Sequence, residues 1–355
     1  MILRSIQKTN VDQFVQTETD IIYAQGTSLY KSGILEDKPT LLFEGSEEEE
    51  GFQEIYLHNT LIYTNDIHGN GVLITDKGAE FLTGFTIVNV ISETELLCNH
   101  DKKTVIYNIE SKTSKVVLPV KCFKFKYNID SDVLFYVENY NVIKAYNITT
   151  AELIWEFDVS ELAKYIPPFK KEYKLGEIYK IAGVYKNQLI FTATSNKVIG
   201  LNKNDGELLW VKDTLDSETK DENSLKATVI GRDLILDSKN GCLYSFYGNF
   251  FITLNIETQN AKVIWDTNKD FTFRGTKKFD SSKILFRAWR RENIGNDDTI
   301  GLFDIKEKVV TWQHVMDFRK GGFIPASFTC VHLSETHLSV LDFEKTLHIF
   351  EHSGF

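Results

Sequence analysis

The histidines are the first residues to test for chemistry, because imidazole binds metals and transfers protons near neutral pH. His348 and His352 are four residues apart, and His332 and His337 flank a predicted turn. On a strand, a spacing of four puts two side chains on one face but well separated. No three of these histidines have the spacing of a ligand set with a carboxylate nearby. The sequence therefore predicts no metal site and no catalytic histidine.

Other motifs that carry chemistry are missing as well. The sequence has no glycine-rich phosphate loop, no Gly-x-Ser-x-Gly and no Cys-x-x-Cys. The segment 296–298 (Asn-Asp-Asp) offers oxygen ligands for Ca²⁺, but the rest of a calcium-loop pattern is absent. We expect buried free thiols at the scattered cysteines, and we expect no bound cofactor and no catalytic residue. The cysteines are Cys98, Cys122, Cys242 and Cys330.

Charge limits the classes of partner. Lysines alternate with aromatic residues at 121–126 and 164–174, a pattern typical of single-strand nucleic-acid platforms. The net charge of −10 opposes binding to nucleic acid and to anionic membranes, and it permits a basic protein partner. Neither a signal peptide nor a long apolar run is present, so we expect a cytoplasmic protein.

One short segment has the residue types that dominate protein interfaces. Residues 287–291 (Arg-Ala-Trp-Arg-Arg) place a tryptophan among three arginines. An acidic run at 47–50 supplies the opposite charge. The alternative for the tryptophan is packing under its own loop. The candidate partner-binding residues are Trp289, Arg287, Arg290, Arg291, Glu47, Glu48, Glu49 and Glu50.

The elements that must position these residues are short strands. Residues 198–213 are predicted to form a β-hairpin, with Asp205-Gly206 in the turn and Trp210 on the second strand. Similar hairpins end in three other tryptophans, so that Trp155, Trp210, Trp265 and Trp312 are separated by 55, 55 and 47 residues. Such a period indicates a repeat architecture.

Four apolar runs recur in each repeat. We assign repeats to 13–43, 52–82, 85–119, 122–157, 178–211, 225–266 and 275–314, and an eighth from 326 with only three runs. The run Ile2–Ile6 is left over and is predicted to complete that last sheet. The fold class is therefore all-β, a single β-propeller domain over residues 1–355. Eight four-stranded blades are favoured and seven remain possible, and one short helix is expected from Asp158 to Tyr165.

The hairpins resemble the PQQ-like propeller repeat, in which an Asn or Asp precedes a Trp by about eight residues. Proteins with this repeat include quinone-dependent dehydrogenases, an outer-membrane assembly lipoprotein and binding modules. The resemblance implies a propeller, whereas the adjacent cysteines of the dehydrogenases are missing here. The spacing of eight is kept at Asn147 and Trp155, Asn202 and Trp210, and Asp304 and Trp312, and Asn255 to Trp265 is two residues longer.

The long connections are predicted to share one face. With the strands of a blade named A to D from the centre outward, D–A and B–C connections open on the same side. Insertions that gather on one side of a repeat scaffold are typical of a binding face, although that side could simply tolerate insertions. The long connections are 44–51, 158–177, 212–224 and 315–325 (D–A), and 239–249 and 289–297 (B–C).

These observations predict a binding protein without catalytic activity, a monomer when free, that contacts another protein through its loop-rich face. The composition suits a bacterial genome rich in A and T, so we consider an immunity protein that neutralises a basic toxin. The alternative is an enzyme with a site at the central pore: a hydrolase, a lyase or a quinone-type oxidoreductase.

Overall fold

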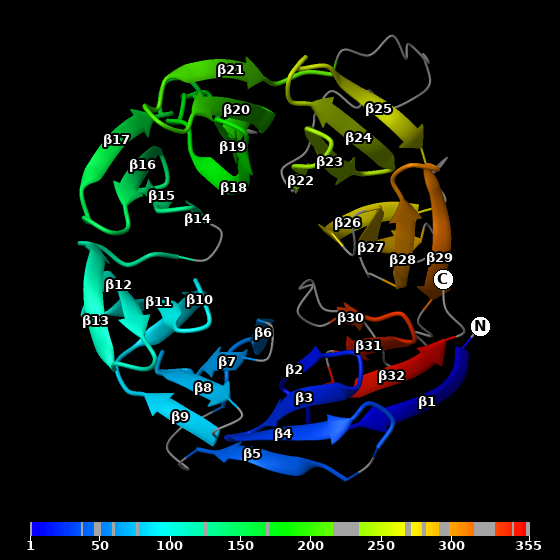
Figure 1. Ribbon diagram of the computed structural model, residues 1–355. Coiled ribbons are helices and arrows are strands. Elements are labelled where there is room, and N and C mark those ends of the chain that lie inside the picture. Colours follow the sequence, from blue (N-terminus) through cyan, green and yellow to red (C-terminus); the bar gives the residue numbers. More distant parts are fainter. Residues whose placement is uncertain are drawn as a thin grey trace. The chain divides into compact units, whose positions relative to one another are not determined.

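The computed structural model is an all-β structure built from eight four-stranded antiparallel sheets, the blades of a β-propeller (Figure 1). The predicted fold class and the count of eight blades are confirmed. The only helical element among the described residues is the 3-10 turn η1 (Thr194–Asn196). The structure describes residues 2–36, 38–45, 51–58, 61–75, 78–123, 126–167, 170–215, 234–266, 271–278, 282–290, 298–315, 331–342 and 344–352.

The contacts divide the chain into two compact units. Unit 1 comprises residues 1–115, 293–301 and 311–355, and unit 2 comprises 116–292 and 302–310. The single domain over residues 1–355 stays a prediction.

Unit 1 holds blades 1, 2 and 8 and most of blade 3. Blade 1 is β2 (Gln13–Gln16), β3 (Asp20–Gln25), β4 (Ser28–Gly33) and β5 (Thr40–Glu44). Blade 2 is β6 (Tyr56–His58), β7 (Leu61–Asn65), β8 (Gly71–Thr75) and β9 (Gly78–Leu82). Blade 3 is β10 (Thr86–Val90), β11 (Glu95–His100), β12 (Lys103–Asn108) and β13 (Thr113–Leu118). Blade 8 is β30 (Val331–Leu333), β31 (His337–Leu341), β32 (Leu347–His352) and β1 (Ile2–Lys8).

Unit 2 holds blades 4, 5 and 6 and most of blade 7. Blade 4 is β14 (Tyr127–Asp130), β15 (Val133–Glu138), β16 (Val142–Asn147) and β17 (Leu153–Asp158). Blade 5 is β18 (Ile178–Tyr185), β19 (Gln188–Ala193), β20 (Lys197–Asn202) and β21 (Leu208–Lys212). Blade 6 is β22 (Ile235–Asp237), β23 (Cys242–Tyr247), β24 (Phe250–Asn255) and β25 (Ala261–Asp266). Blade 7 is β26 (Phe271–Lys278), β27 (Lys283–Arg290), β28 (Thr299–Asp304) and β29 (Val309–Val315).

The first and last strands of the chain pair with each other, as predicted. β1 runs antiparallel to β32, with Lys8 opposite Leu347 and Ile2 opposite His352 (Figure 1, dark blue beside red). A side-chain contact between the two strands supports the pairing: the Nδ1 of His348 lies 3.1 Å from the amide nitrogen of Gln7. The Nε2 of the same histidine lies 2.7 Å from a carboxylate oxygen of Asp342. Blade 8 therefore takes its outer strand from the other end of the sequence.

The Asn or Asp that starts each repeat hairpin closes the turn between strands C and D. The Oδ1 of Asn147 accepts backbone N–H bonds from Thr149 (2.8 Å) and Thr150 (2.9 Å). The side-chain oxygens of Asn108, Asn255 and Asp304 each accept the same two bonds, and that of Asn202 accepts one, from the N–H of Asn204. A short carbonyl or carboxylate side chain is needed to reach these amides, which explains the residue type.

The tryptophans join consecutive blades. In unit 2 the Nε1 of Trp155 donates to the carbonyl oxygen of Lys203 in the next blade, at 2.9 Å. The indole lies on Gly206, where an added Cβ would come within 2.7 Å of the ring. Trp155 and Trp210 are each 7% exposed, so both are part of the core, as predicted.

Apolar clusters fill the spaces between successive blades within each unit. In unit 1 such clusters join blade 8 to 1, blade 1 to 2 and blade 2 to 3. In unit 2 they join blade 4 to 5, blade 5 to 6 and blade 6 to 7. Blades 1, 2, 5 and 6 are therefore apolar on both faces, unlike a sheet with one wet face.

Two local expectations were wrong. The segment 158–165 is not a helix: it forms one turn at Ser160–Ala163, where the N–H of Ala163 donates to the carbonyl of Val159 (2.9 Å) and that of Lys164 to the carbonyl of Glu161 (3.4 Å). The segment 239–249 is not one long B–C connection either, because its centre is strand β23. Among the described residues, no helix is long and apolar enough to cross a membrane.

Removing the closing strand tests the pairing of β1 with β32. Deletion of residues 1–7 should lower the melting temperature and promote aggregation, because it leaves β32 with an unpaired edge. Differential scanning calorimetry and light scattering measure the two effects. A truncated protein that melts like the full chain would contradict the structure of blade 8.

A left-handed residue follows each capping Asn or Asp by four positions, and it is glycine only at Gly206 (φ 77°). Ala151 adopts φ 60° at the equivalent place. Ala151→Gly should therefore raise the free energy of unfolding by about 1 kcal/mol, since the Cβ penalty is removed. Gly206→Ala is the reciprocal control and should lower it. Chemical denaturation that shows destabilisation by Ala151→Gly would refute this account.

Candidate protein-binding surface

The end of a blade on which its connections open follows from the strand register. In blade 4, Val142 at the start of strand C lies opposite Asp158 at the end of strand D. The N–H of Val159 then donates to the carbonyl of Asn141 in the B–C turn, at 2.9 Å. The D–A and B–C connections of this blade therefore share one end, which we call the D–A end.

The described part of the sequence-predicted segment, residues 287–290, is the last part of β27, which ends at the D–A end of blade 7. Arg290 is the last residue of β27 and pairs with Phe271, the first residue of β26. Trp289 and Arg290 are half-buried, and the guanidinium of Arg274 lies 5.8 Å from the centre of the Trp289 ring. Arg287 is 3% exposed and lies beneath the surface, so it cannot meet a partner directly.

The remaining predicted residues are not placed. Arg291 and the run Glu47–Glu50 lie outside the described residues. The structure therefore brings Trp289 and Arg290 to the same end of blade 7, and the role of the acidic run stays a prediction.

A different set of side chains forms the most exposed apolar region of unit 2. Five large hydrophobic residues near the D–A end of blade 4 are between 47% and 65% exposed. Lysines are their neighbours in the sequence, and the ammonium groups of Lys126 and Lys164 lie over the rings of Tyr140 and Tyr173. We call this set the aromatic–lysine surface: Phe123 (61%), Tyr140 (65%), Ile166 (47%), Tyr173 (65%) and Leu175 (54%), with Lys121, Lys126, Lys164, Lys170, Lys171 and Lys174.

Lys126 joins three parts of this surface. Its backbone N–H donates to the carbonyl of Phe123 (3.0 Å), and its ammonium lies 5.3 Å from the centre of the Tyr140 ring. The same ammonium donates to the carbonyl of Ile178, whose own N–H donates to the carbonyl of Tyr140 at 2.6 Å. Burial lowers the pKa of Lys126, and the carboxylate of Glu177 opposes that shift. Residues distant in sequence are thus held together.

The long connection 158–177 is fastened at its base. Gly176 donates to the carbonyl of Ser160 at 2.7 Å, and an added Cβ on Gly176 would come within 2.6 Å of Ala163. Farther out, Tyr165 and Lys174 exchange two backbone hydrogen bonds (3.1 and 2.8 Å). The connection is therefore a hydrogen-bonded arm, and Tyr173 and Leu175 have defined positions on it.

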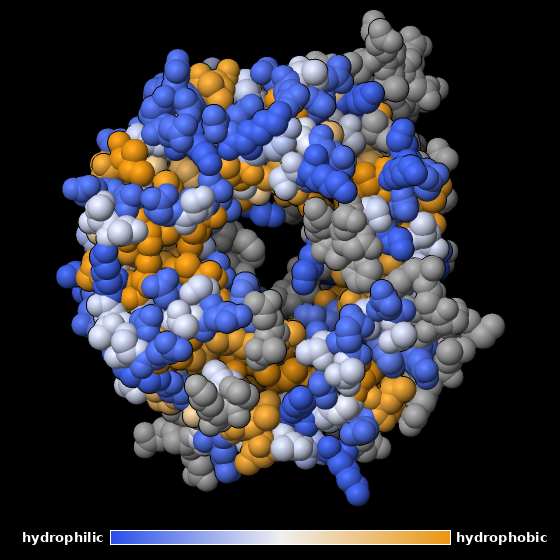
Figure 2. Space-filling view, in the orientation of Figure 1, coloured by the Kyte–Doolittle hydropathy of each residue, from blue (hydrophilic) through white to orange (hydrophobic). Residues whose placement is uncertain are grey.

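The sequence contained a signal for this surface. The alternation of Lys and aromatic residues at 121–126 and 164–174 is typical of a binding surface for single-stranded nucleic acid. The net charge of the chain opposes that ligand, and the pattern by itself indicates no other. Tyr140, from the three-residue turn 139–141, carried no such signal. On the face seen in Figure 2, hydrophilic residues predominate, and hydrophobic residues gather over strands β14–β16.

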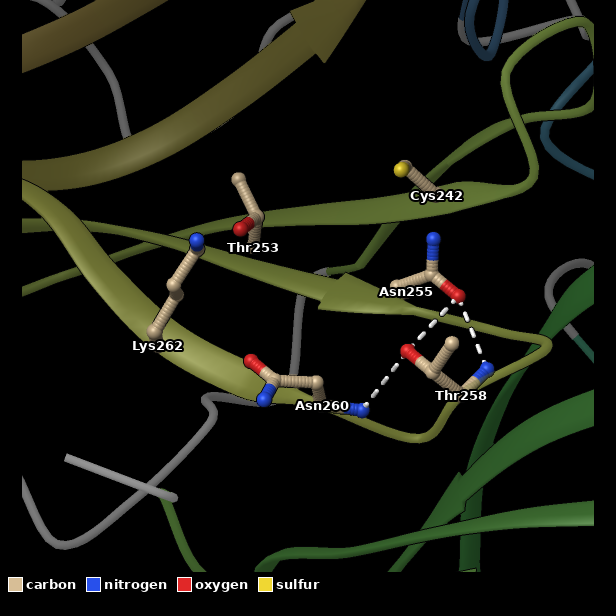
Figure 3. A pocket seen from close by; sticks show the side chains of 6 residues that line it. All are labelled: Cys242, Thr253, Asn255, Thr258, Asn260 and Lys262. Atoms are coloured by element: carbon tan, nitrogen blue, oxygen red, sulfur yellow. Dashed lines mark hydrogen bonds between the residues drawn. The ribbon is translucent and has the colours of Figure 1, made fainter.

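The hollow in blade 6 is a weaker candidate. It has a volume of about 480 Å³ and lies at the C–D turn (Figure 3). Asn255 already accepts hydrogen bonds from the backbone and hydroxyl of Thr258, at 2.8 and 3.0 Å, so the turn itself uses these polar groups. Burial and the nearby Asp237 raise the pKa of the Cys242 thiol, which makes it a poor nucleophile. The lining residues are Cys242, Thr253, Asn255, Thr258, Asn260 and Lys262.

The other residues that could do chemistry are buried or packed against aromatic rings. Cys98 and Cys122 are buried free thiols, as predicted, and burial raises the pKa of Cys98 to about 12. His332 lies edge-on to Phe14, with ring centres 4.9 Å apart. In the part of the chain that the structure describes, no three His, Cys, Asp or Glu side chains are grouped to hold a metal.

Comparison with known proteins concerns the fold alone. No family model and no curated protein matches the sequence. The chain is similar in structure to the C-terminal WD40 domain of Sif2 (TM-score 0.62, 12% identity, covering 98% of this chain and 99% of that one). It is also similar to BamB from Moraxella catarrhalis (TM-score 0.56, 11% identity, 99% and 98% covered) and to the computationally designed Ika8 protein (TM-score 0.60, 10% identity, 99% and 98% covered). At such low identity, the likeness shows a β-propeller.

Two tryptophans separate core from surface. Trp210→Ala should lower the free energy of unfolding by about 3–5 kcal/mol, because a buried indole is lost. Its Nε1 also donates to the side-chain oxygen of Gln188 at 2.6 Å. Trp289→Ala should cost much less, because this ring is half-buried. Equal losses in urea denaturation would make Trp289 a core residue and remove it from the candidate binding residues.

Proposed function

We propose that this chain is a non-catalytic propeller that binds another protein through its D–A end. The observation that carries the proposal is the aromatic–lysine surface, whose five large hydrophobic side chains are exposed on one end of unit 2. Exposed apolar patches with a polar rim are typical of protein-binding sites. Tyrosine is also among the residues that contribute most to interfaces, since it buries a large area at a small entropic cost.

The position of the surface supports the proposal. Loops on a rigid repeat scaffold vary without disturbing the core, so binding residues tend to collect there. The arm 158–177 is such a loop, and its hydrogen bonds at Ser160 and Gly176 hold its shape before any partner arrives. A preformed site loses less conformational entropy on binding than a disordered one.

The narrower form of the proposal adds a repeat family, a cellular compartment and the charge of the partner. The hairpins from Asn147 and Asn202 support membership of the PQQ-like repeat family. The proposed protein is cytoplasmic and monomeric when free, and it binds neither nucleic acid nor membranes. With a net charge of −10 it attracts a basic partner, as an immunity protein that neutralises a toxin would.

Affinity capture from the source organism tests the binding function. The double variant Tyr140→Ala, Tyr173→Ala should recover at least about tenfold less partner than the wild type, because truncating interface anchors costs upwards of 1–2 kcal/mol. The matched control is Ile154→Ala, Leu209→Ala, which truncates side chains that are 44% and 45% exposed on the outer strands β17 and β21. Quantitative mass spectrometry measures recovery.

Two outcomes would contradict the proposal. Equal recovery by the Tyr140 and Tyr173 double variant would exclude this surface, and loss in the control alone would move binding to the outer strands. Turnover of a small molecule by the purified chain would favour the enzyme alternative.

A further inference from the structure

We propose that the aromatic–lysine surface takes a short acidic segment of the partner protein, with apolar or aromatic residues between its acidic ones. The inference rests on the proposed function and names the chemistry of the segment that this surface selects. Three observations carry it: the local charge, the orientation of the aromatic rings and the shape of the arm.

Positive charge is in local excess on this surface. Six described lysines accompany four acidic residues, Asp158, Glu161, Glu172 and Glu177. Glu161 is already paired with Lys164 at 3.2 Å, and Glu177 lies near Lys126. Four of the lysines are exposed and form no ion pair with any described residue: Lys121, Lys170, Lys171 and Lys174. Carboxylates on a bound segment would neutralise these ammonium groups.

The aromatic rings are oriented but not covered. The ammonium of Lys164 lies 5.4 Å from the centre of the Tyr173 ring, as Lys126 lies over Tyr140. A cation within about 6 Å of a ring centre is attracted to the face of the ring. Both tyrosines remain 65% exposed, so each offers a free face to an apolar side chain. The surface thus needs apolar residues as well as acids from its ligand.

A protein segment fits this surface better than a nucleic acid. Non-specific nucleic-acid sites use a continuous basic groove that tracks the phosphates. Here Glu161, Glu172 and Glu177 interrupt the lysines, and the whole chain carries a net charge of −10. A short segment with a few carboxylates can avoid these glutamates. A nucleic acid has a phosphate at every nucleotide, so some of its phosphates would be repelled by them.

The local preference is compatible with a basic partner. The net charge of the chain influences the rate at which partners meet. In salt, charges more than about 10 Å apart are largely screened from each other. Contacts inside that distance depend on the nearest groups, which here are lysines and tyrosines. A basic protein that presents one acidic segment satisfies both requirements.

Selection from a random peptide library displayed on phage tests the inference. Clones are kept if they bind the wild-type chain and fail to bind the variant Tyr140→Ala, Tyr173→Ala. We expect the retained sequences to be net negative, with Phe, Trp, Tyr or Leu between the acids. Retained sequences that are neutral or basic would overturn the inference.

Charge reversal on the chain supplies the second measurement. Lys170→Glu, Lys171→Glu, Lys174→Glu should weaken binding of a retained peptide, labelled with fluorescein, by about tenfold or more, and added salt should weaken the wild-type complex. The matched control reverses three exposed lysines elsewhere in unit 2, Lys239, Lys262 and Lys306. It should leave the affinity unchanged, and circular dichroism checks that both variants fold. Equal weakening by both triple variants would overturn the inference, because the effect would then follow net charge.

The remaining outcomes separate this inference from the proposed function. If partner capture needs Tyr140 and Tyr173 while retained peptides are not acidic, protein binding stands and the acidic preference falls. If no clone distinguishes the wild type from the tyrosine variant and capture is also unaffected, both fall. Tighter binding of an oligothymidine strand than of the retained peptides, abolished by the lysine reversal, would replace the acidic segment by a nucleic acid.

Discussion

In unit 2 the indole of Trp155 lies against the turn of the next blade and donates its N–H to the carbonyl of Lys203. This contact makes two demands at once. It requires a turn whose backbone comes close enough to touch a ring, which Gly206 provides, and it requires the turn to present a carbonyl outward. The Asn202 side chain fixes that turn by accepting a backbone N–H. The stacking of blades, the shape of the turn and the residue types in it therefore depend on one another. This dependence explains why the pattern repeats in the sequence.

The same dependence explains which features could be predicted from sequence. The spacing from Asn147 to Trp155 is set by the length of a hairpin, so it survives in the sequence and reveals the blades. The closing strand was predictable because blade 8 lacked a fourth run. Strand β23 was missed because Gly241 and Gly248, with φ of 62° and 58°, bound a strand that looked like part of a loop.

The arm and its surface could not be predicted in the same way. The carbonyl of Ser160 accepts a bond from Gly176, sixteen positions later, and this tertiary bond replaces the helical one that the local pattern favoured. Likewise, the segments that carry Phe123, Tyr140 and Ile178 are joined through Lys126. Such contacts depend on how the backbone closes, and no period or composition encodes them. The net charge of −10 is a property of the whole chain and does not locate the lysines on it.

The pairing of Ile2–Lys8 with Leu347–His352 also orders events during synthesis. β1 is made before all the other strands of the eight blades, and its partner β32 is made after them. Blades 1 to 7 contain only strands close to one another in sequence, so each has the local contacts that fold quickly. Blade 8 cannot form until β32 has been synthesised, and until then the backbone N–H and C=O groups of β1 have no strand to pair with. β1 contains the polar residues Arg4, Ser5, Gln7 and Lys8, which are suited to keeping it in solution until β32 has been made.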